Sequence, residues 1–434
     1  MKRDDGDGGR ASVRPGLHED VRRLLRRHVK EGYSGLLGQH YCYIEPSPRR
    51  YPFQWFWDSC FHVMMLARLG EHDLAKRCLR SLFAMQRDNG FVGHMVFWNR
   101  VLPTRPTDVV QARPSWTDLR PHMSELVQPP FAAQALLALH RASGDRVFLG
   151  ELYARLKRHH DWLARERDFD GDGLLTIITP FESGMDWKAS YDPVVGHRSR
   201  STPSRLYTAA YFWKVVSVDW HNFARRYDLR RIRAAGKFIV KDAGFNAAYA
   251  LDLRAMEALA GIAGDDPQPY RERRHRVARA MLEKMYDEDA AAFWDLWEPG
   301  ARPLRVVTPT ILFPLALEDI PSAVASRVVE RHLGPSAGLS TDLPVPTVAK
   351  DDPAFTPGSS AYIWRGPTWA YPNWFLYHAF RRRGLDGLAA RLRGALSQGV
   401  RRSGFREYYN PFTGEGYGAK DFTWSGLLLD MEGT

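Results

Sequence analysis

The sequence predicts an all-α fold, in which helix hairpins close into a toroid. Three observations lead to this prediction. Helix-like segments recur in pairs along the chain, long loops rich in Gly, Pro and aromatic residues separate many of them, and strand signals are few and short, as at 174–178 and 305–308. The period is loose and the pairs share little sequence identity, so the pattern indicates an architecture and not a regular sequence repeat.

The predicted elements follow in order. An amphipathic helix is expected at 17–31, where Leu17, Val21, Leu24, Leu25 and Val29 form one apolar stripe. The further helices are expected in the pairs 59–69 with 71–85, 131–143 with 145–165 and 205–227 with 241–263, and then singly at 270–286, 322–332, 369–383 and 386–401. The long loops are 41–58, 86–130, 168–204, 333–368 and 402–424, and function is expected where they gather at one rim of the scaffold.

The ends of the chain indicate how it is divided. Residues 1–16 are polar, charged and rich in glycine, and they lack the apolar core of a signal peptide, so we expect a disordered leader. Residues 17–434 contain no evident linker, and we expect a single catalytic domain there although the usual length prior suggests two or three. No run is long and apolar enough for a membrane span, so no membrane partner is expected.

Charge and cysteine content narrow the function classes. The formal net charge is +11, but much of the excess is arginine on helix-like segments, and no basic-aromatic module or DNA-reading motif accompanies it. Nucleic acid is therefore not expected as a partner. The three cysteines, at spacings that match neither a zinc motif nor a disulfide framework, favour a reducing compartment, and we expect a cytoplasmic protein.

The stretch Phe181-Glu182-Ser183-Gly184-Met185-Asp186-Trp187 is the first candidate for chemistry. A carboxyl group between a Gly-Met step and an indole is partly desolvated, and desolvation raises a carboxyl pKa toward the range that a general acid needs near neutral pH. The structural alternative is a loop acid that caps a helix. The second acid is expected in Phe405-Arg406-Glu407-Tyr408-Tyr409-Asn410, where Glu407 beside two tyrosines is the candidate partner of Asp186.

Other loops carry candidate sugar-binding residues. Clusters of tryptophan with Gly, Arg, Asp and Glu suit a sugar site, because rings stack on pyranose faces and carboxylates bind hydroxyls, although core packing must account for some of the 14 tryptophans. Gln128, before two prolines, is either a ligand or a helix cap, Arg365 is either part of a cation–π stack or a ligand for an anionic group, and Glu415 is either a hydroxyl ligand or a turn residue. The expected substrate-binding set is Tyr51, Trp55, Trp57, Asp58, Gln128, Gly184, Trp364, Arg365, Gly366, Trp369 and Glu415.

No metal or cofactor is expected. Asp168-Phe169-Asp170-Gly171-Asp172-Gly173 is similar to the start of a calcium loop, but Thr179 stands where the bidentate Glu is required, so we interpret it as a tight acidic turn and leave a structural Ca²⁺ open. The histidines and cysteines show no zinc spacing, and no phosphate-binding glycine loop or nucleophile elbow occurs.

Taken together, these motifs resemble glycoside hydrolase family 63 and its trehalase relatives. They are Tyr51-Pro52-x-x-Trp55-x-Trp57-Asp58, Gln128-Pro129-Pro130, Glu182-Ser183-Gly184-Met185-Asp186, Trp364-Arg365-Gly366-Pro367-x-Trp369 and Glu407-Tyr408-Tyr409-Asn410, and the likeness spans roughly residues 40 to 430. The chain is most similar to the small bacterial mannosylglycerate and glucosylglycerate hydrolases of the family.

The resemblance implies an (α/α)6 barrel and inverting hydrolysis of an α-glycosidic bond in a small carbohydrate. It implies Asp186 as the general acid and Glu407 as the general base, and it places Tyr51, Trp55, Trp57, Asp58, Gln128, Trp364, Arg365 and Trp369 along the substrate. Where many oligosaccharide-cleaving relatives continue Asn-Ser-Pro after the acid, this chain has Trp187-Lys188-Ala189-Ser190, which bears on the leaving group. We hypothesise that Lys188, with Tyr51 and Arg365, favours an anionic aglycone such as glycerate.

Other functions remain open at this point. One is an α-gluco-oligosaccharidase or a trehalase-like hydrolase. Helical toroids also host sugar epimerases and polysaccharide lyases, which need a His or Tyr base, and His94 and His122 are the loop histidines to consider. A non-catalytic sugar-binding protein is the third alternative. The sequence leaves the choice between glucose and mannose, the aglycone and the oligomeric state undetermined.

Overall fold

Helices make up about 53% of the protein, and its sheets are small. The computed structural model describes residues 16–35, 37–48, 50–98, 110–112, 122–199, 204–358 and 363–432. Within these ranges, five sheets of two or three short strands accompany the helices. The expectation of a mainly helical chain is confirmed, whereas the predicted leader lies, except for Gly16, outside the described residues.

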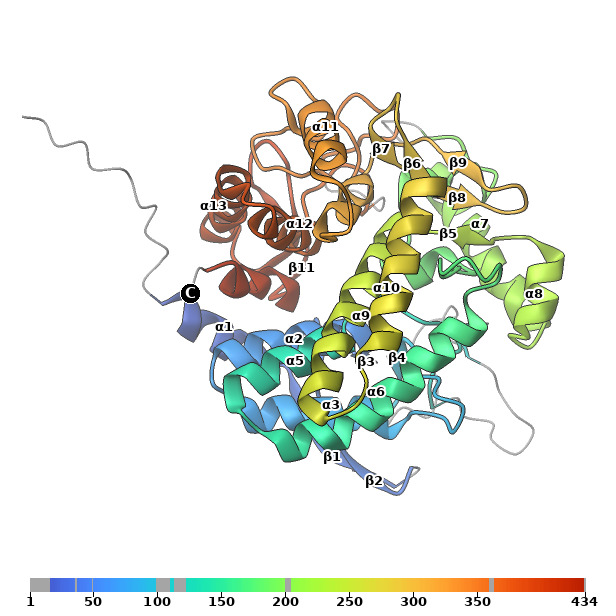
Figure 1. The fold of residues 1–434 in the computed structure, drawn as a ribbon. Helices are drawn as coiled ribbons and strands as arrows, with labels where there is room; N and C mark the ends of the chain where they lie inside the picture. Colours follow the sequence, from blue (N-terminus) through green and yellow to red (C-terminus); the bar gives the residue numbers. More distant parts are fainter. Residues whose placement is uncertain are drawn as a thin grey trace, which may run out of the picture.

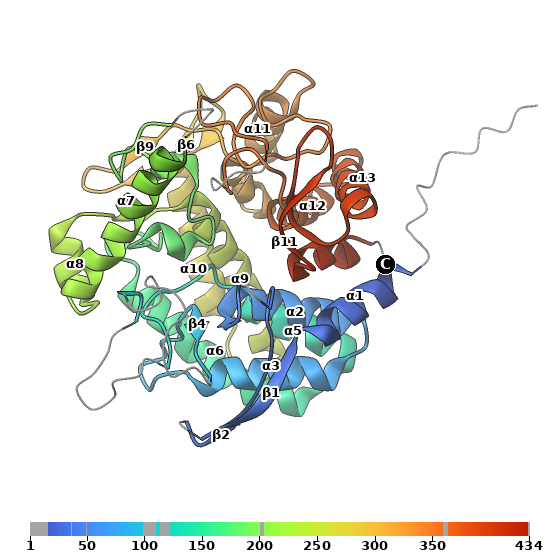
Figure 2. The same cartoon turned by 180° about the vertical axis from the view of Figure 1, so that it is seen from behind.

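Six segments far apart in sequence contact one another in a closed cycle (Figures 1 and 2). Each segment packs against the next, and the last returns to the first. The cycle runs through α2 (Phe56–Arg68), α5 (Ala132–Ser143), α9 (Ala243–Ala263), the 3-10 segment η4 (Pro309–Ala316), α12 (Ala370–Arg382) and the 3-10 segment η5 (Thr423–Met431).

A second set of helices packs against this cycle from outside. Besides the predicted pairings α2 with α3 (His72–Ala84) and α5 with α6 (Arg146–Glu166), α10 (Gln268–Ala280) packs on α9, α11 (Ser322–Leu333) on η4, α13 (Asp386–Ser403) on α12 and α1 (Leu17–Arg27) on η5. The contact of α1 with η5 joins the two ends of the chain, where His18 Nε2 lies 3.0 Å from Glu432 Oε2.

Some predicted elements are wrong or were missed. The first helix ends at Arg27 and not at residue 31, because the chain turns at His28 into the hairpin β1 (Val29–Ser34) and β2 (Gln39–Ile44). The pairing of 205–227 with 241–263 is wrong, since the main contacts of α9 are with α10, α5 and η4 and not with α7 (Arg205–Ala224). The segments η4 and η5 were missed because they are short and, in η4, interrupted by Pro314, which suits a 3-10 segment better than an α-helix.

The remaining elements are short. The strand predicted at 174–178 is a single bridge between Ile177 and Val240, and the one predicted at 305–308 lies just earlier, as β9. The small elements are β3 (Gln54–Trp55), β4 (Met95–Val96), η1 (Pro180–Ser183), η2 (Ala189–Tyr191), α8 (Leu229–Ala235), β5 (Val240–Lys241), the π turn η3 (Met281–Met285), β6 (Tyr286–Asp287), β7 (Ala292–Phe293), β8 (Asp295–Trp297), β9 (Arg302–Leu304), β10 (Arg406–Tyr409) and β11 (Gly416–Lys420).

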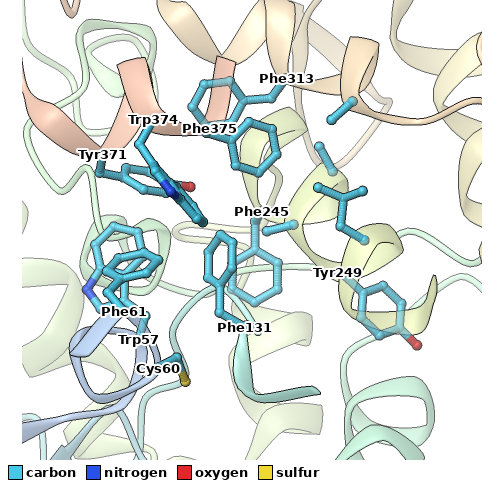
Figure 3. Packing of buried hydrophobic residues seen from close by; sticks show 14 of the residues in the cluster. Trp57, Cys60, Phe61, Phe131, Phe245, Tyr249, Phe313, Tyr371, Trp374 and Phe375 are labelled. Carbon is cyan, nitrogen blue, oxygen red and sulfur yellow. The ribbon is translucent and has the colours of Figure 1, made fainter. Parts of the chain in front are cut away.

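Aromatic side chains from the inner segments meet in the centre of the protein (Figure 3). Phe61 of α2 lies 5.0 Å from Phe131, the N-cap residue of α5, and 5.4 Å from Trp374 of α12, measured between ring centroids. Phe313 of η4 stacks on Phe375 at 4.2 Å. Because burial of one such side chain contributes about 1.5–3 kcal/mol, this cluster holds the inner segments together and leaves the loops beyond their ends to carry the polar residues.

The long loops contact one another. The backbone N–H of Thr423 donates to the carbonyl of Pro46 at 3.1 Å, which ties 402–424 to 41–58. The N–H of Phe56 donates to the carbonyl of His94 at 2.9 Å, which ties 41–58 to 86–130. Thr368 bridges to Tyr409, which ties 333–368 to 402–424. Motifs separated by hundreds of residues are therefore brought into one region.

The acidic stretch 168–173 folds as the expected tight turn, in which the N–H of Gly173 donates to Asp168 Oδ2 at 2.9 Å. The ammonium group of Lys241 lies 2.6 Å from Asp170 and 2.7 Å from Asp172, and so neutralises the two carboxylates. Within the described ranges, no group of three or more His, Cys, Asp or Glu is arranged to hold a metal ion, and no helix is long and apolar enough to cross a membrane.

Candidate active site

Asp186 and Glu407 come from loops 221 residues apart in sequence and lie close enough to interact electrostatically. Asp186 follows η1 and is half-buried, whereas Glu407 lies on β10 and is fully buried. Arg50 lies near both carboxyls. The two acids therefore lie in one region, and their pairing as acid and base stays a prediction.

The environment of Asp186 favours a proton on its carboxyl group. Burial raises its pKa to about 6, while a hydrogen bond from the indole Nε1 of Trp364, at 3.2 Å, opposes the rise. The backbone before it is shaped by Gly184, whose φ of +70° is rarely adopted by other residues. A β-carbon at that glycine would lie 2.1 Å from Cη2 of Trp57, so the tryptophan ring packs directly against the acid-bearing loop.

Three donors surround the carboxylate of Glu407. The hydroxyl of Tyr51 donates to Oε1 at 2.8 Å, the backbone N–H of Ala419 donates to Oε2 at 2.7 Å, and Nη1 of Arg50 lies 3.0 Å from the same oxygen. Gly418, with φ of +69°, leaves room for the acid, since a β-carbon there would lie 2.4 Å from Oε2. Sequence reasoning missed Arg50 and Gly418, and their only signal was their position beside a named motif.

The tryptophans form a stack and a supporting layer. Trp364 and Trp369 lie parallel, with ring centroids 3.9 Å apart. The indole N–H of Trp369 donates to the carbonyl of Ile363 at 2.7 Å and not to Asp186. Trp57 meets Trp424 edge to face at 4.9 Å. Trp424, which sequence reasoning did not select, also packs against the stacked pair, with its centroid 5.8 Å from that of Trp369 and 6.3 Å from that of Trp364.

Asp58 and Gln128 are both buried and bonded within the protein. Asp58 accepts a hydrogen bond from Nε1 of Trp424 at 2.5 Å, and burial raises its pKa to about 7. Oε1 of Gln128 accepts from the backbone N–H of Trp57 at 3.1 Å, in the first turn of α2. Gln128 was expected to cap the helix that it precedes, but the N-cap of α5 is Phe131, and Gln128 bonds the first turn of α2 instead. A direct contact of Asp58 or Gln128 with a sugar stays a prediction.

Trp55 is the one tryptophan of its motif that is only half-buried. Its ring lies 5.8 Å from that of Tyr51, edge to face, and so next to the phenol that bonds Glu407. In the part of the chain that the structure describes, its indole N–H is buried without a hydrogen-bond acceptor. A buried donor without a partner is costly, so this N–H is available to donate to a ligand, and its contact with a sugar hydroxyl stays a prediction.

The expectation that Arg365 and Lys188 meet an anionic substrate group is contradicted. Arg365 is 2% exposed, and its guanidinium pairs with Asp192, with Nη1 2.8 Å from Oδ2. Lys188 is fully buried, and its ammonium contacts Asp242 and Asp295. Both charges are neutralised inside the protein, because carboxylates distant in sequence fold against them.

Arg365 instead braces the acid loop. Its Nε donates to the carbonyl of Trp187 at 3.0 Å, one residue after Asp186, and its guanidinium lies over the ring of Tyr211 with the centroid 4.6 Å away. Trp364 thus holds the carboxyl group of Asp186, and Arg365 holds the backbone carbonyl of the next residue, Trp187. The adjacent Gly366, with φ of +124°, donates its N–H to Oγ1 of Thr347 at 3.0 Å and forms the turn.

Three other candidates are placed by their partners. Glu415 is exposed and accepts a hydrogen bond from Tyr417 at 2.8 Å, as the turn interpretation expects, and its contact with substrate stays a prediction. Glu182, the other carboxylate of the acid-bearing stretch, is fully buried and accepts from Nη1 of Arg167 at 2.8 Å, so it is held in an ion pair. His94 is buried, with Nδ1 2.6 Å from Oγ of Ser124.

Comparison with known proteins identifies the family. The family described as "Mannosylglycerate hydrolase MGH1-like glycoside hydrolase domain" matches residues 51–425. This chain is a glycoside hydrolase of that family. Among its relatives, a mannosylglycerate hydrolase from Rubrobacter radiotolerans is 34% identical over 90% of this chain and 92% of its own. A glucosylglycerate hydrolase from Mycolicibacterium hassiacum is 28% identical over 89% and 93%.

A solved structure extends the similarity to the fold. The crystal structure of a mannosylglycerate hydrolase of glycoside hydrolase family 63 from Thermus thermophilus, in complex with Tris and D-glycerate, aligns with a TM-score of 0.82 and 28% identity over 96% of this chain and 99% of that one. Membership of this family excludes the epimerase, lyase and non-catalytic alternatives, whereas the oligosaccharidase and trehalase-like alternatives concern the substrate and stay open.

Proposed function

We propose that this glycoside hydrolase cleaves α-mannosylglycerate or α-glucosylglycerate with inversion, using Asp186 as general acid and Glu407 as general base. The observation that carries the proposal is the pair itself. One carboxyl has a pKa raised to about 6 and is half-buried, and the other is held by the hydroxyl of Tyr51 and a backbone N–H in the same region. The names of the relatives support the substrate class.

In the proposed reaction, Asp186 delivers its proton to the glycosidic oxygen as the bond to the anomeric carbon breaks. Glu407 takes a proton from a water molecule, which attacks that carbon from the opposite face, so the configuration inverts. The two carboxyl groups are expected to be roughly 6.5–9.5 Å apart when substrate is bound, which leaves room for the water. Tyr51 and Ala419 orient the base, and Trp364 orients the acid.

The proposed sugar contacts centre on Trp55 and Trp364. The unpartnered N–H of Trp55 would donate to a sugar hydroxyl. Trp364, beside the acid, would stack on the sugar or form a hydrogen bond with it. Two glycines, Gly184 and Gly366, shape the loops around this space. We propose that Tyr51, Trp57, Asp58, Gln128 and Trp369 define the remaining outline of the sugar site.

We further propose that residues 17–434 form one (α/α)6 barrel. The closed cycle of six inner segments, each with an outer helix against it, supports this architecture, and the contacts among the long loops support an active site at one rim. A cytoplasmic location is also proposed, because Cys42, Cys60 and Cys78 are free thiols, as is usual in a reducing compartment.

The test of function is a substrate panel with an anomeric readout. Purified enzyme is incubated with α-mannosylglycerate, α-glucosylglycerate, trehalose, maltose and the two glycosylglycerols, and the first-formed sugar is followed by proton NMR. We expect hydrolysis of a glycosylglycerate with initial release of the β-anomer. Release of the α-anomer would show retention, and a preference for trehalose or maltose would favour the trehalase-like or oligosaccharidase alternative.

The glycosylglycerols test the aglycone. They differ from the glycerates by the carboxylate alone, so equal kcat/KM on the two compounds would remove the anionic-aglycone hypothesis. Since Lys188 and Arg365 are neutralised, a preference for glycerate would require a different donor for the carboxylate.

A further inference from the structure

A cavity of about 390 Å³ lies away from the acid pair, between the acidic turn 168–173, α6, α9 and α10. Its lining includes Asp161, Asp168, Tyr249, Arg273 and Arg276, none of which belongs to the site described above. The volume falls within the range of small-molecule sites. What this cavity can bind depends on which polar groups of its lining already have a hydrogen-bond or ion-pair partner.

The phenol of Tyr249 is the most buried polar group in this lining. Its side chain is 2% exposed, and in Figure 3 its hydroxyl points away from the central aromatic cluster. Among the described residues this hydroxyl has no hydrogen-bond partner. Four charged residues of the lining, Asp161, Asp168, Arg273 and Arg276, act electrostatically on it, so charges of both signs lie near this hydroxyl.

The lining has five charged groups: Arg165 pairs with Glu166, and the other four form one neutralised pair and one open pair. Nη1 of Arg273 donates to Asp161 at 2.8 Å, so these two charges compensate each other. Asp168 uses Oδ2 to accept from Gly173, but its Oδ1 is buried without a partner in the described chain. Arg276 likewise forms no ion pair or side-chain hydrogen bond within the described residues, and its stem packs beside Gly173.

We propose that this cavity binds a small organic acid that carries a hydrogen-bond donor, either a hydroxyl or an ammonium group. The carboxylate of the ligand would accept from Arg276 and from the hydroxyl of Tyr249, and the donor would satisfy Oδ1 of Asp168. A ligand of this class matches all three open groups at once. An apolar ligand would leave them unpaired, which disfavours it.

Three acids with the same carbon skeleton test the proposal. Propanoate has no donor, 3-hydroxypropanoate has a hydroxyl and 3-aminopropanoate has an ammonium group, and each is titrated into the full-length enzyme by calorimetry and ligand-observed NMR. We expect at least one of the two donor-bearing acids to bind saturably, with a dissociation constant of roughly millimolar or better, and about 10-fold tighter than propanoate. The donor-bearing acid that binds better distinguishes a hydroxy acid from an amino acid.

Variants locate the binding. Arg276→Ala should weaken it by about 10-fold or more, and Tyr249→Phe, which keeps the ring, by about 5-fold. Arg279→Ala is the matched control, because Arg279 is also exposed on α10 but does not line the cavity. Asp168→Asn should weaken the ammonium-bearing acid more than the hydroxyl-bearing one.

Two outcomes would overturn the proposal. One is the absence of saturable binding by all three acids up to roughly 50 mM, and the other is binding that Arg276→Ala and Tyr249→Phe leave unchanged. Since Arg276 is exposed, its variant is expected to fold, and thermal unfolding checks this. The outcome does not depend on the proposed reaction, because no residue of the cavity lies in the acid pair.

Discussion

The indole N–H of Trp364 donates a hydrogen bond to Oδ1 of Asp186 at 3.2 Å, across 178 positions of the chain. A hydrogen bond to a carboxylate stabilises its ionised form, whereas burial favours the protonated form. Burial prevails here and raises the pKa to about 6. Trp364 therefore limits a rise in pKa that the pocket itself produces, while it orients the acid.

The first prediction concerns pH. A general acid must be protonated, so kcat/KM should fall as the pH rises through about 6, the pKa of Asp186. Trp364→Phe removes the donor that lowers this pKa, so the alkaline limb should move to higher pH, and the maximal rate should fall because the acid is less well oriented. Trp369→Phe is the control, since its N–H serves Ile363 and the limb should stay in place. If the alkaline limb of the pH profile stayed in place in Trp364→Phe, a group other than Asp186 would be responsible for it.

The second prediction separates the acid from the base. Asp186→Asn should lower kcat on the natural glycoside by roughly 10²–10⁴-fold, and activity should largely return on a glycoside with a very good leaving group, which needs little protonation. Glu407→Gln should be impaired on both substrates, because the attacking water still requires a base. Initial rates on the two substrates give the comparison, and recovery of Glu407→Gln on the activated glycoside would contradict the assigned roles.

The third prediction concerns the buried pair of Arg365 and Asp192. Asp192→Asn leaves the Arg365 charge without its partner, and loss of one member of a buried pair costs about 3–5 kcal/mol in free energy of unfolding. Since Arg365 also bonds the residue after Asp186, kcat should fall more than KM rises. Urea unfolding and steady-state kinetics measure the two effects. If Arg365 instead bound substrate directly, Arg365→Lys would mainly raise KM.

The fourth prediction compares two glycines of the acid-bearing loop. Gly184 and Gly196 both have positive φ, of +70° and +64°, so alanine at either costs about 1–2 kcal/mol in backbone strain. Only at Gly184 does the added β-carbon meet a ring, at 2.1 Å from Trp57, while the space at Gly196 is open. Gly184→Ala should therefore lose most activity and lower the Tm clearly more than Gly196→Ala. Similar Tm values would mean that the contact with Trp57 is easily relieved.

Much of this protein could be predicted from local sequence. The positions of the long helices follow from apolar periodicity, which records the face that each helix buries, and most predicted boundaries lie within a few residues of the observed ones. The sequence predicts the association of Asp186 and Glu407 because each lies in an unusual motif with aromatic neighbours. Such motifs indicate that the local backbone and the solvation of the acid are unusual, and this can be recognised from the sequence without knowledge of the fold.

Partners, by contrast, were decided by the tertiary structure alone. Lys188 and Arg365 looked like cations available to a substrate, but Asp242, Asp295 and Asp192 fold against them and remove that availability. The two 3-10 segments that complete the inner cycle have too little periodicity to predict, and packing against their neighbours stabilises them. The sequence shows which charged side chains a chain contains. Whether a charge is neutralised by a partner depends on contacts between residues far apart in the sequence, and only the folded chain determines those contacts.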